Sequence, residues 1–232
     1  MSLSMGGVDV QSYQQRERLL RMKKLLVFLC GVAFLLATAG AAMATNIALN
    51  STVTLNGGTF FTDGTWTGGI PATSSTLVDG EFRPLHSQWN QNTVFWDAHD
   101  DEDNGQYIKF DLGGIYNIDS FIAQVDDNDA YVLSYWNMTS NSWETAWDIP
   151  NYTSGHWGMT TRPDPYNNLL AFDIGGIITT NALKLEGNLL DGDKYFAVAE
   201  IQAFGAPVPE PATFILLGSG LAGLAFYRRK RK

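Results

Sequence analysis

Carboxylate side chains occur in short, closely spaced groups in the middle of this 232-residue chain. The three groups lie at residues 99–105, 126–129 and 191–193. Carboxylates on alternate residues of a loop can bind Ca²⁺, but none of the three groups has the spacing of an EF-hand loop. We therefore interpret them as solvated turns. The alternative is that they gather at one end of a folded domain and form the rim of a ligand site.

Seven tryptophans form a second set of chemically informative side chains, and all of them lie between residues 66 and 157. Exposed aromatic rings stack on the faces of sugars, and neighbouring Asn, Asp or His side chains bind sugar hydroxyl groups. Trp96, Trp136 and Trp143 are expected to pack in a core or at a sheet edge. The candidate ligand-binding residues on loops are Trp66, Trp89, His156, Trp157 and Tyr166.

Residue patterns typical of catalysis are missing from the sequence. The three histidines, His86, His99 and His156, do not have the spacing of a metal-binding motif. No serine lies in a Gly-x-Ser-x-Gly sequence. Pairs of carboxylates are frequent in any chain this acidic, so they do not by themselves indicate glycoside hydrolysis. We therefore predict that the protein is not an enzyme.

Charge is distributed unevenly along the chain. The formal charge of the whole chain is −9, but ten of the fifteen basic residues lie in the two terminal segments. Between Thr45 and Ala206, five basic residues stand against twenty-one acidic ones, a net charge of −16. Binding to a nucleic-acid backbone requires a basic face. Nucleic acid is therefore excluded as a partner, whereas divalent cations and neutral glycans are compatible with this charge.

Apolar and polar residues alternate with a period of two in several runs between residues 45 and 206. Examples are 107–112, 131–136 and 183–185, with turn-forming residues between such runs. This alternation predicts an antiparallel all-β domain, a sandwich or a barrel. No stretch of this segment has a convincing helical period.

One six-residue sequence occurs twice in this segment. Phe-Asp-Leu-Gly-Gly-Ile at 110–115 returns as Phe-Asp-Ile-Gly-Gly-Ile at 172–177. A Gly-Gly pair suits a tight turn after a strand. We interpret the two copies as similar strand exits in one sheet; a duplicated hairpin is the alternative.

The N-terminal segment has the order of a secretory signal peptide. Two lysines precede an apolar run at 25–37, and small residues follow, ending at Ala42 and Ala44. This order predicts a signal peptide at 22–44 that is cleaved after Ala44; an uncleaved anchor is the alternative. Residues 1–21 fit no part of such a signal and are interpreted as a misassigned start or an extension. The single cysteine, Cys30, lies in the signal peptide, so the mature protein has neither a disulfide nor a thiol.

The C-terminal segment combines Pro209-Glu210-Pro211, an uncharged apolar stretch at 212–227 and a basic end at 228–232. In lipid, such an apolar stretch satisfies its backbone only as a helix. Its sixteen residues would span roughly 24 Å, short of the ~30 Å hydrocarbon core of a bilayer. A short helix suits transient insertion better than permanent anchoring, which is the alternative.

This tail resembles the PEP-CTERM sorting signal of exopolysaccharide-producing Gram-negative bacteria. The resemblance implies export through a secretion translocon across the inner membrane, and transient anchoring there. It also implies that a membrane-embedded exosortase cleaves near Pro209-Glu210-Pro211, and that the protein then resides at the cell surface or outside the cell.

The segment between the two signals also resembles a known family. It opens with Asn46-Ile47-Ala48-Leu49-Asn50, continues with Leu77-Val78-Asp79-Gly80 and closes with Ala199-Glu200-Ile201-Gln202-Ala203-Phe204-Gly205. This order of strands resembles the discoidin or coagulation-factor type C domain, which implies a galactose-binding-like jelly-roll sandwich over residues 45–206. Many glycan-binding members hold a structural calcium ion. By this resemblance, the ion would be bound by the carboxylates of Asp79 and Glu200 and by backbone carbonyls, including those of Glu81 and Ala199. The alternative is that Asp79 only shapes a turn and Glu200 faces solvent.

Together, these features predict an exported, exosortase-processed surface or extracellular-matrix protein. Its β-sandwich would bind carbohydrate without catalysis and associate with exopolysaccharide. Two alternatives stay open on the sequence alone: a purely structural biofilm or matrix protein, and a calcium-dependent adhesion protein that binds no specific glycan.

Overall fold

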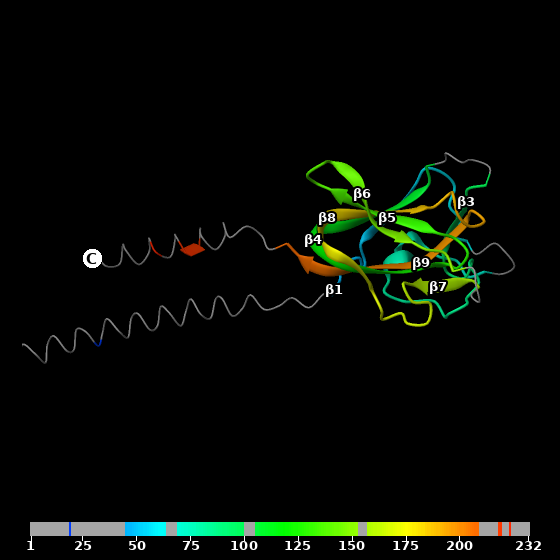
Figure 1. The fold of residues 1–232 in the computed structure, drawn as a ribbon, viewed down its shortest axis with the longest axis horizontal. Coiled ribbons are helices and arrows are strands. Elements are labelled where there is room, and N and C mark those ends of the chain that lie inside the picture. Colours follow the sequence, from blue (N-terminus) through cyan, green and yellow to red (C-terminus); the bar gives the residue numbers. More distant parts are fainter. Residues whose placement is uncertain are drawn as a thin grey trace, which may run out of the picture. The chain divides into compact units, whose positions relative to one another are not determined.

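The computed structural model describes residues 45–63, 69–99, 105–152 and 157–208, together with the single residues Leu19, Gly218, Ser219 and Gly223 (Figure 1). The chain divides into two compact units, Met1–Ala42 and Met43–Lys232. The folded domain belongs to the second unit. Several predicted features lie outside the described residues: the signal peptide with Ala42 and Ala44, Trp66, His156, Pro209-Glu210-Pro211 and the apolar stretch at 212–227.

Nine strands and one 3-10 helix make up the described domain (Figure 1). All pairs of strands are antiparallel, which confirms the predicted all-β antiparallel sandwich. Within the described residues, no helix has both the length and the apolar character needed to cross a membrane. The elements are β1 (Thr45–Asn46), β2 (Thr52–Asn56), η1 (Ser74–Val78), β3 (Val94–Asp97), β4 (Tyr107–Asp126), β5 (Tyr131–Asn137), β6 (Ser142–Ile149), β7 (Met159–Arg162), β8 (Phe172–Gly187) and β9 (Tyr195–Pro207).

Strand β4 connects the two layers of the sandwich. Its first part, residues 107–111, pairs with β2 and β8, and β8 continues to β5 and β6. Its second part, residues 116–126, pairs with β9 and, near its end, with β7, while residues 116–121 also pair with β8. Strands β1 and β3 pair with opposite ends of β9. A strand that passes from one sheet to the other needs a bend, and bulges supply it.

The repeated Gly-Gly sequence supplies these bends. Pairing of β4 with β8 is interrupted between Asp111 and Tyr116, and again where β8 runs from Asp173 to Ile178 opposite residues 118–120. In each bulge an aspartate accepts a hydrogen bond from a glycine N–H: Gly113 to Asp111 at 3.0 Å and Gly175 to Asp173 at 2.8 Å. The expected strand exits are wrong, because both strands continue past the glycines. The repeat instead forms two equivalent corners.

The core lies between the layers and follows the predicted alternation. Ile108, Phe110, Leu133 and Leu183 are fully buried, and their neighbours along each strand are more exposed. Each large apolar side chain of this kind contributes about 1.5–3 kcal/mol on burial. Trp96 is 2 % exposed, as expected for a core residue. Trp136 and Trp143 form an edge-to-face pair 5.4 Å apart on β5 and β6, as expected for an edge.

Candidate functional site

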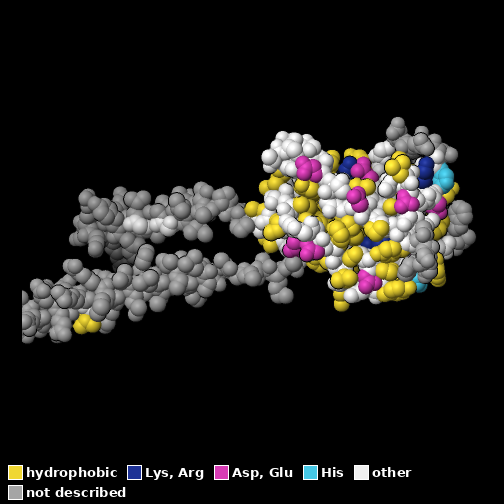
Figure 2. Space-filling model, viewed as in Figure 1, with side chains coloured by type: hydrophobic (Ala, Val, Ile, Leu, Met, Phe, Trp, Pro, Cys, Tyr) yellow, Lys and Arg dark blue, Asp and Glu magenta, His cyan; other side chains and the backbone are white. Residues whose placement is uncertain are grey.

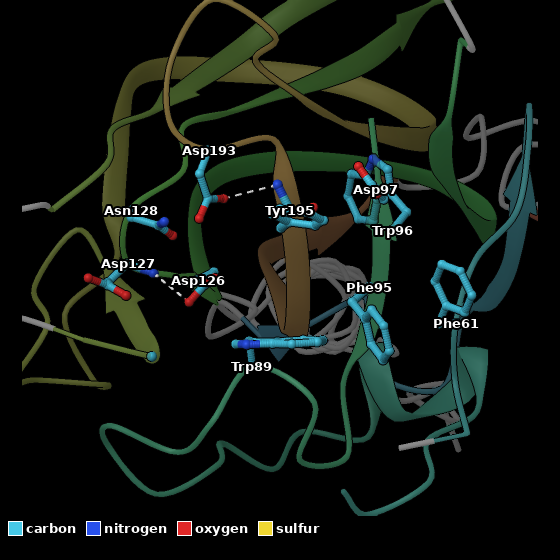
Figure 3. Close-up of a pocket in the computed structure, with 11 residues that line it drawn as sticks. Phe61, Trp89, Phe95, Trp96, Asp97, Asp126, Asp127, Asn128, Asp193 and Tyr195 are labelled. Atoms are coloured by element: carbon cyan, nitrogen blue, oxygen red, sulfur yellow. Dashed lines mark hydrogen bonds between the residues drawn. The ribbon is translucent and has the colours of Figure 1, made fainter. Parts of the chain in front are cut away.

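A cavity of about 600 Å³ opens where β9 begins, between β3 and the end of β4 (Figure 3). This volume lies in the usual range for small-molecule sites. Figure 3 shows an acidic side with Asp126, Asp127, Asn128 and Asp193, and an aromatic side with Phe61, Phe95 and Trp96. Trp89, Asp97, Gly158 and Tyr195 complete the lining.

The aromatic side is built on strand β3. Phe95 N–H donates to the Phe61 carbonyl at 3.1 Å and Phe61 N–H donates to the Phe95 carbonyl at 2.8 Å. This bridge stacks the two rings at 5.2 Å with an interplanar angle of 18°. Trp89, on the preceding loop, meets Phe95 edge-to-face at 4.8 Å. Three rings from separate segments therefore present a joined apolar surface to the cavity.

The acidic side joins two turns that are far apart in the sequence. Asp126 ends β4 and Asp127 begins the turn that follows; they are 6 % and 8 % exposed. The turn before β9 contains Asp193, whose Oδ1 accepts the Tyr195 N–H at 3.0 Å (Figure 3). Lys194 N–H donates to Asp129 Oδ1 at 3.2 Å and so ties the turns together. The interpretation as solvated turns is wrong for 126–129, whereas residues 191–193 are exposed as expected. The hydrogen bond shows that these two groups lie together; a ligand site at their rim stays a prediction.

Burial changes the acidity of two of these carboxyl groups. The pKa of Asp126 is raised to about 7, mainly by desolvation and then by the negative charges of Asp127 and Asp129. The pKa of Asp129 is also raised to about 7, mainly by desolvation and then by the negative charge of Asp193. The Oδ2 atom of Asp129 is buried and has no hydrogen-bond partner. Near neutral pH, both groups therefore exchange between the protonated and ionised forms.

A buried arginine stabilises the acidic turn through hydrogen bonds to its backbone carbonyls. Arg162 is 0 % exposed, and its guanidinium donates to the carbonyls of Asp126 and Asp127 at 3.1 and 3.2 Å. It also donates to the Pro150 carbonyl at 2.8 Å and lies 4.2 Å from the centre of the Tyr152 ring. A guanidinium with this many acceptors is stable in the interior and fixes the carbonyls that it binds. No motif in the sequence separates Arg162 from an ordinary surface arginine.

The five candidate ligand-binding residues do not share one site in the part of the chain that the structure describes. Trp89 lines the cavity, whereas Trp157 is 63 % exposed and stacks on His86 at 4.9 Å, next to the lining residue Gly158. Tyr166 lies in a different, smaller depression of about 160 Å³. Trp66 and His156 lie outside the described residues.

Sequence reasoning missed four side chains of the cavity. The alternation along β3 was an available signal, since Phe95 and Asp97 lie on the opposite face of the strand from buried Val94. Phe61 and Tyr195 gave no such signal, because a bridge and a tertiary turn bring them to the cavity. The missed lining residues are Phe61, Phe95, Asp97 and Tyr195.

The residues expected to bind calcium lie where the loop after η1 meets the middle of β9. Glu200 is 0 % exposed; its Oε1 accepts the Gly80 N–H at 3.0 Å, and its Oε2 is buried without a partner. Burial, followed by the negative charge of Asp79, raises the pKa of Glu200 to about 8. The alternative in which Glu200 faces solvent is wrong. An unpartnered oxygen beside a second carboxylate fits a bound cation.

Two observations weaken this cation site. Arg83 Nη2 lies 3.6 Å from Asp79 Oδ2 and donates to the Glu81 carbonyl at 3.0 Å, so a guanidinium already contacts two of the expected ligands. Asp79 Oδ1 accepts the Glu81 N–H at 2.8 Å and thereby shapes the turn. Over the described ranges, no group of three or more His, Cys, Asp or Glu side chains is arranged to hold a metal ion.

Several solved structures resemble the chain at low identity. The chitosan-binding module 1 of a chitosanase/glucanase from Paenibacillus sp. IK-5 has 17% identity and a TM-score of 0.39, over 69% of this chain and 99% of that one. A fucose-binding module, SpX-3, from Streptococcus pneumoniae has 13% identity and a TM-score of 0.44, over 68% and 96%. The family 32 carbohydrate-binding module of C. perfringens NanJ, solved with galactose, has 14% identity and a TM-score of 0.41, over 70% and 98%.

Sequence comparison is informative for the tail. A search of curated protein sequences finds no match for the chain. A family model described as the PEP-CTERM protein-sorting motif matches residues 207–232, directly after β9 ends at Pro207. The β-sandwich is therefore followed by a PEP-CTERM protein-sorting motif.

Proposed function

We propose that the cavity at the start of β9 binds a glycan and that the protein is an exported, non-catalytic carbohydrate-binding protein. The observation that carries this proposal is a single cavity with aromatic rings on one side and carboxylate and amide oxygens on the other. A sugar ring has the matching halves: C–H faces that pack on aromatic rings, and hydroxyl groups that donate to oxygens. Rings from β3 and its preceding loop would bind the face, and Asn128 and Asp193 the hydroxyl groups.

The charge of the cavity limits the kind of glycan. Asp97, Asp126, Asp127 and Asp193 line it, and no lysine or arginine is among the lining residues in the part of the chain that the structure describes. Like charges at close range repel strongly where water is partly excluded. The proposed ligand is therefore a neutral or amino-bearing saccharide, and uronic acids and sulfated sugars would bind more weakly.

The sorting motif supports the proposed route of the protein. An exosortase would recognise Pro209-Glu210-Pro211 and the tail after export through the translocon, with residues 22–44 serving as the signal peptide. The mature protein would then reside at the surface or outside a Gram-negative cell, in association with exopolysaccharide. The acidic surface of the domain is compatible with this location. On the face in view, carboxylates are spread among neutral and apolar side chains (Figure 2).

A structural calcium ion is part of this proposal. The carboxylates of Glu200 and Asp79 and the carbonyls of Ala199 and Glu81 would hold it, and the Oε2 of Glu200 supports the assignment. When bound, the ion would offset the buried negative charge of Glu200. It would also fasten the loop after η1 to β9. The same observation favours a second candidate function, a calcium-dependent matrix or adhesion protein without a specific glycan ligand.

A glycan-binding screen of the purified protein tests the proposal, with Trp89→Ala as the critical variant and Trp143→Ala as the matched control. Loss of one aromatic stacking partner, worth about 1.5 kcal/mol, weakens binding about tenfold. Trp143 lies at the β5–β6 edge and not in the cavity, so its removal is expected to leave binding unchanged. Equal loss in both variants, or a screen without any bound glycan, would contradict the proposal.

A further inference from the structure

The chain enters and leaves the sandwich at the same end. Thr45 of β1 pairs with Gly205 of β9, and β9 ends two residues later at Pro207. Figure 1 shows β1 beside this end of β9, opposite the end where β9 meets β3. Any segment that precedes Thr45 or follows Pro207 in the precursor therefore starts from this one end, which we call the tether end.

The two Gly-Gly corners lie at the tether end. Tyr116 pairs with Pro207, and Val208 N–H donates to the Ile115 carbonyl at 3.0 Å. Ile118, two residues further along β4, pairs with both Ile178 of β8 and Gly205 of β9. The corner at 113–115 therefore touches the exit of the chain, and the corner at 175–177 lies in the neighbouring strand.

Each corner presents an isoleucine to solvent. Ile115 is 46 % exposed and Ile177 is 70 % exposed, whereas Leu112 in the first corner is buried. The bend itself requires glycine, since Gly113 and Gly175 both have a φ of +71°. It does not require an exposed β-branched apolar side chain after each glycine pair. The same residue type at both exposed positions therefore needs an explanation other than the bend.

The connection between this end and the apolar stretch of the tail is short. Pro211 follows Pro207 by four residues and is itself followed by the apolar stretch at 212–227. Four residues span at most about 14 Å. If the apolar stretch is in the bilayer, the tether end lies within roughly that distance of the headgroup region, which is itself several ångströms thick.

We propose that the tether end is a membrane-contacting surface, on which Ile115 and Ile177 insert among the lipid headgroups while the sorting motif is in the bilayer. This inference rests on the proposed function, because it requires the tail to enter the membrane. Its consequence is an orientation. The glycan cavity lies at the other end of β9, roughly 40 Å away along a strand of 13 residues. It therefore faces away from the membrane before the tail is cleaved.

Spin labels on the full chain in phosphatidylcholine vesicles test this inference. Single-cysteine variants Ile115→Cys and Ile177→Cys are made in a Cys30→Ser background. Leu190→Cys is the matched control, because Leu190 is apolar and 96 % exposed but lies in the turn between β8 and β9, at the cavity end. We expect labels at 115 and 177 to collide several times more often with oxygen, relative to a water-soluble nickel reagent, than the label at 190.

The outcomes separate this inference from the one on which it rests. A chain that does not float with the vesicles at all contradicts membrane insertion of the tail. A chain that floats but carries equally aqueous labels at 115, 177 and 190 overturns only the contact surface. Labels at 115 and 177 could be shielded from the nickel reagent in cells that contain the processing enzyme but not in vesicles. That result overturns the assignment to lipid and indicates a contact with the enzyme.

Discussion

The turn before β9 and the corner at 175–177 of β8 differ in how tightly their glycines are enclosed. At the cavity end, Gly192 has a φ of +83°, and a methyl group there would overlap the Asp129 carboxylate and the Asn128 carbonyl. At the tether end, Gly175 has a φ of +71° and no heavy atom within 4 Å of the position of a methyl group. The turn is closely packed against acidic side chains, whereas the corner is open and carries the exposed Ile177. Glycine thus permits close packing in this turn and only a bend in this corner.

The largest expected effect comes from adding a methyl group at each of these glycines. Gly192→Ala combines an unfavourable backbone conformation with overlap in a packed turn, and is expected to lower the free energy of unfolding by about 3 kcal/mol or more. Gly175→Ala has the backbone penalty alone, about 1 kcal/mol. Urea unfolding of the two variants measures the difference.

Gly176→Ala serves as the reference for the corner, because a methyl group there also meets open space and its φ is not positive. It is expected to be within about 0.5 kcal/mol of the unaltered protein. Equal destabilisation by Gly192→Ala and Gly175→Ala would mean that the turn and the corner are packed equally tightly.

The second effect is a dependence of stability on pH that originates at the cavity end. Asp126 and Asp129 have native pKa values of about 7, above the unfolded value near 4. The native state therefore binds more protons than the unfolded state between these values. The stabilising contribution of these two groups to the free energy of unfolding is therefore fully present below pH 4. It is lost as the pH rises through 7. Asp129→Asn removes one such group and is expected to reduce the fall in the free energy of unfolding with pH by about 2 kcal/mol.

Thermal melts between pH 4 and pH 8 measure this dependence. Asp173→Asn at the tether end is the control, because its exposed carboxylate takes part in the corner turn, and we expect the slope with pH to stay as in the unaltered protein. If Asp129→Asn retains the full fall in stability between pH 4 and pH 7, the carboxyl of Asp129 is not its origin.

The smallest effect concerns the loop after η1, which faces the middle of β9. There, Arg83 and a cation would compete for Asp79 and the Glu81 carbonyl. Arg83→Gln is expected to strengthen calcium binding by about 1 kcal/mol, roughly fivefold in affinity. Calorimetric titration with Ca²⁺ measures it, at about pH 9 so that Glu200, with a pKa of about 8, is largely ionised.

Glu200→Gln should abolish calcium binding with Arg83 present or absent. A titration without heat in both the unaltered protein and Arg83→Gln would contradict the calcium site. The guanidinium of Arg83 would then be the only cationic group in contact with Asp79 among the described residues.

Local patterns predicted much of the fold but less of the site. Alternation identified the strands around Ile108, Leu133 and Leu183, because period two directly reports which face of a strand is buried. Trp89 was among the candidates because an aromatic side chain on a loop can stack on a sugar. The corner role of the Gly-Gly repeat was misread, since a glycine pair marks a bend without saying whether the strand ends there.

Contacts across the domain explain the remaining differences. The sequence predicted that Asp126 and Asp129 are solvated, because aspartate in a turn is normally exposed. Their burial depends on the turn at 191–193, which is distant in the chain. The same holds for Phe61, which reaches the cavity only through its bridge to Phe95.

The sequence by itself determined the β-strand class, the acidity of the domain and the sorting motif at 207–232, because each depends on neighbouring residues or on composition alone. Only the tertiary structure decided that two acidic turns and three aromatic rings share one cavity. It also decided that Glu200 is buried, and that the tail leaves from the end opposite the cavity. These properties depend on strand pairing and layer crossing, which place residues by hydrogen-bond register and not by distance along the chain.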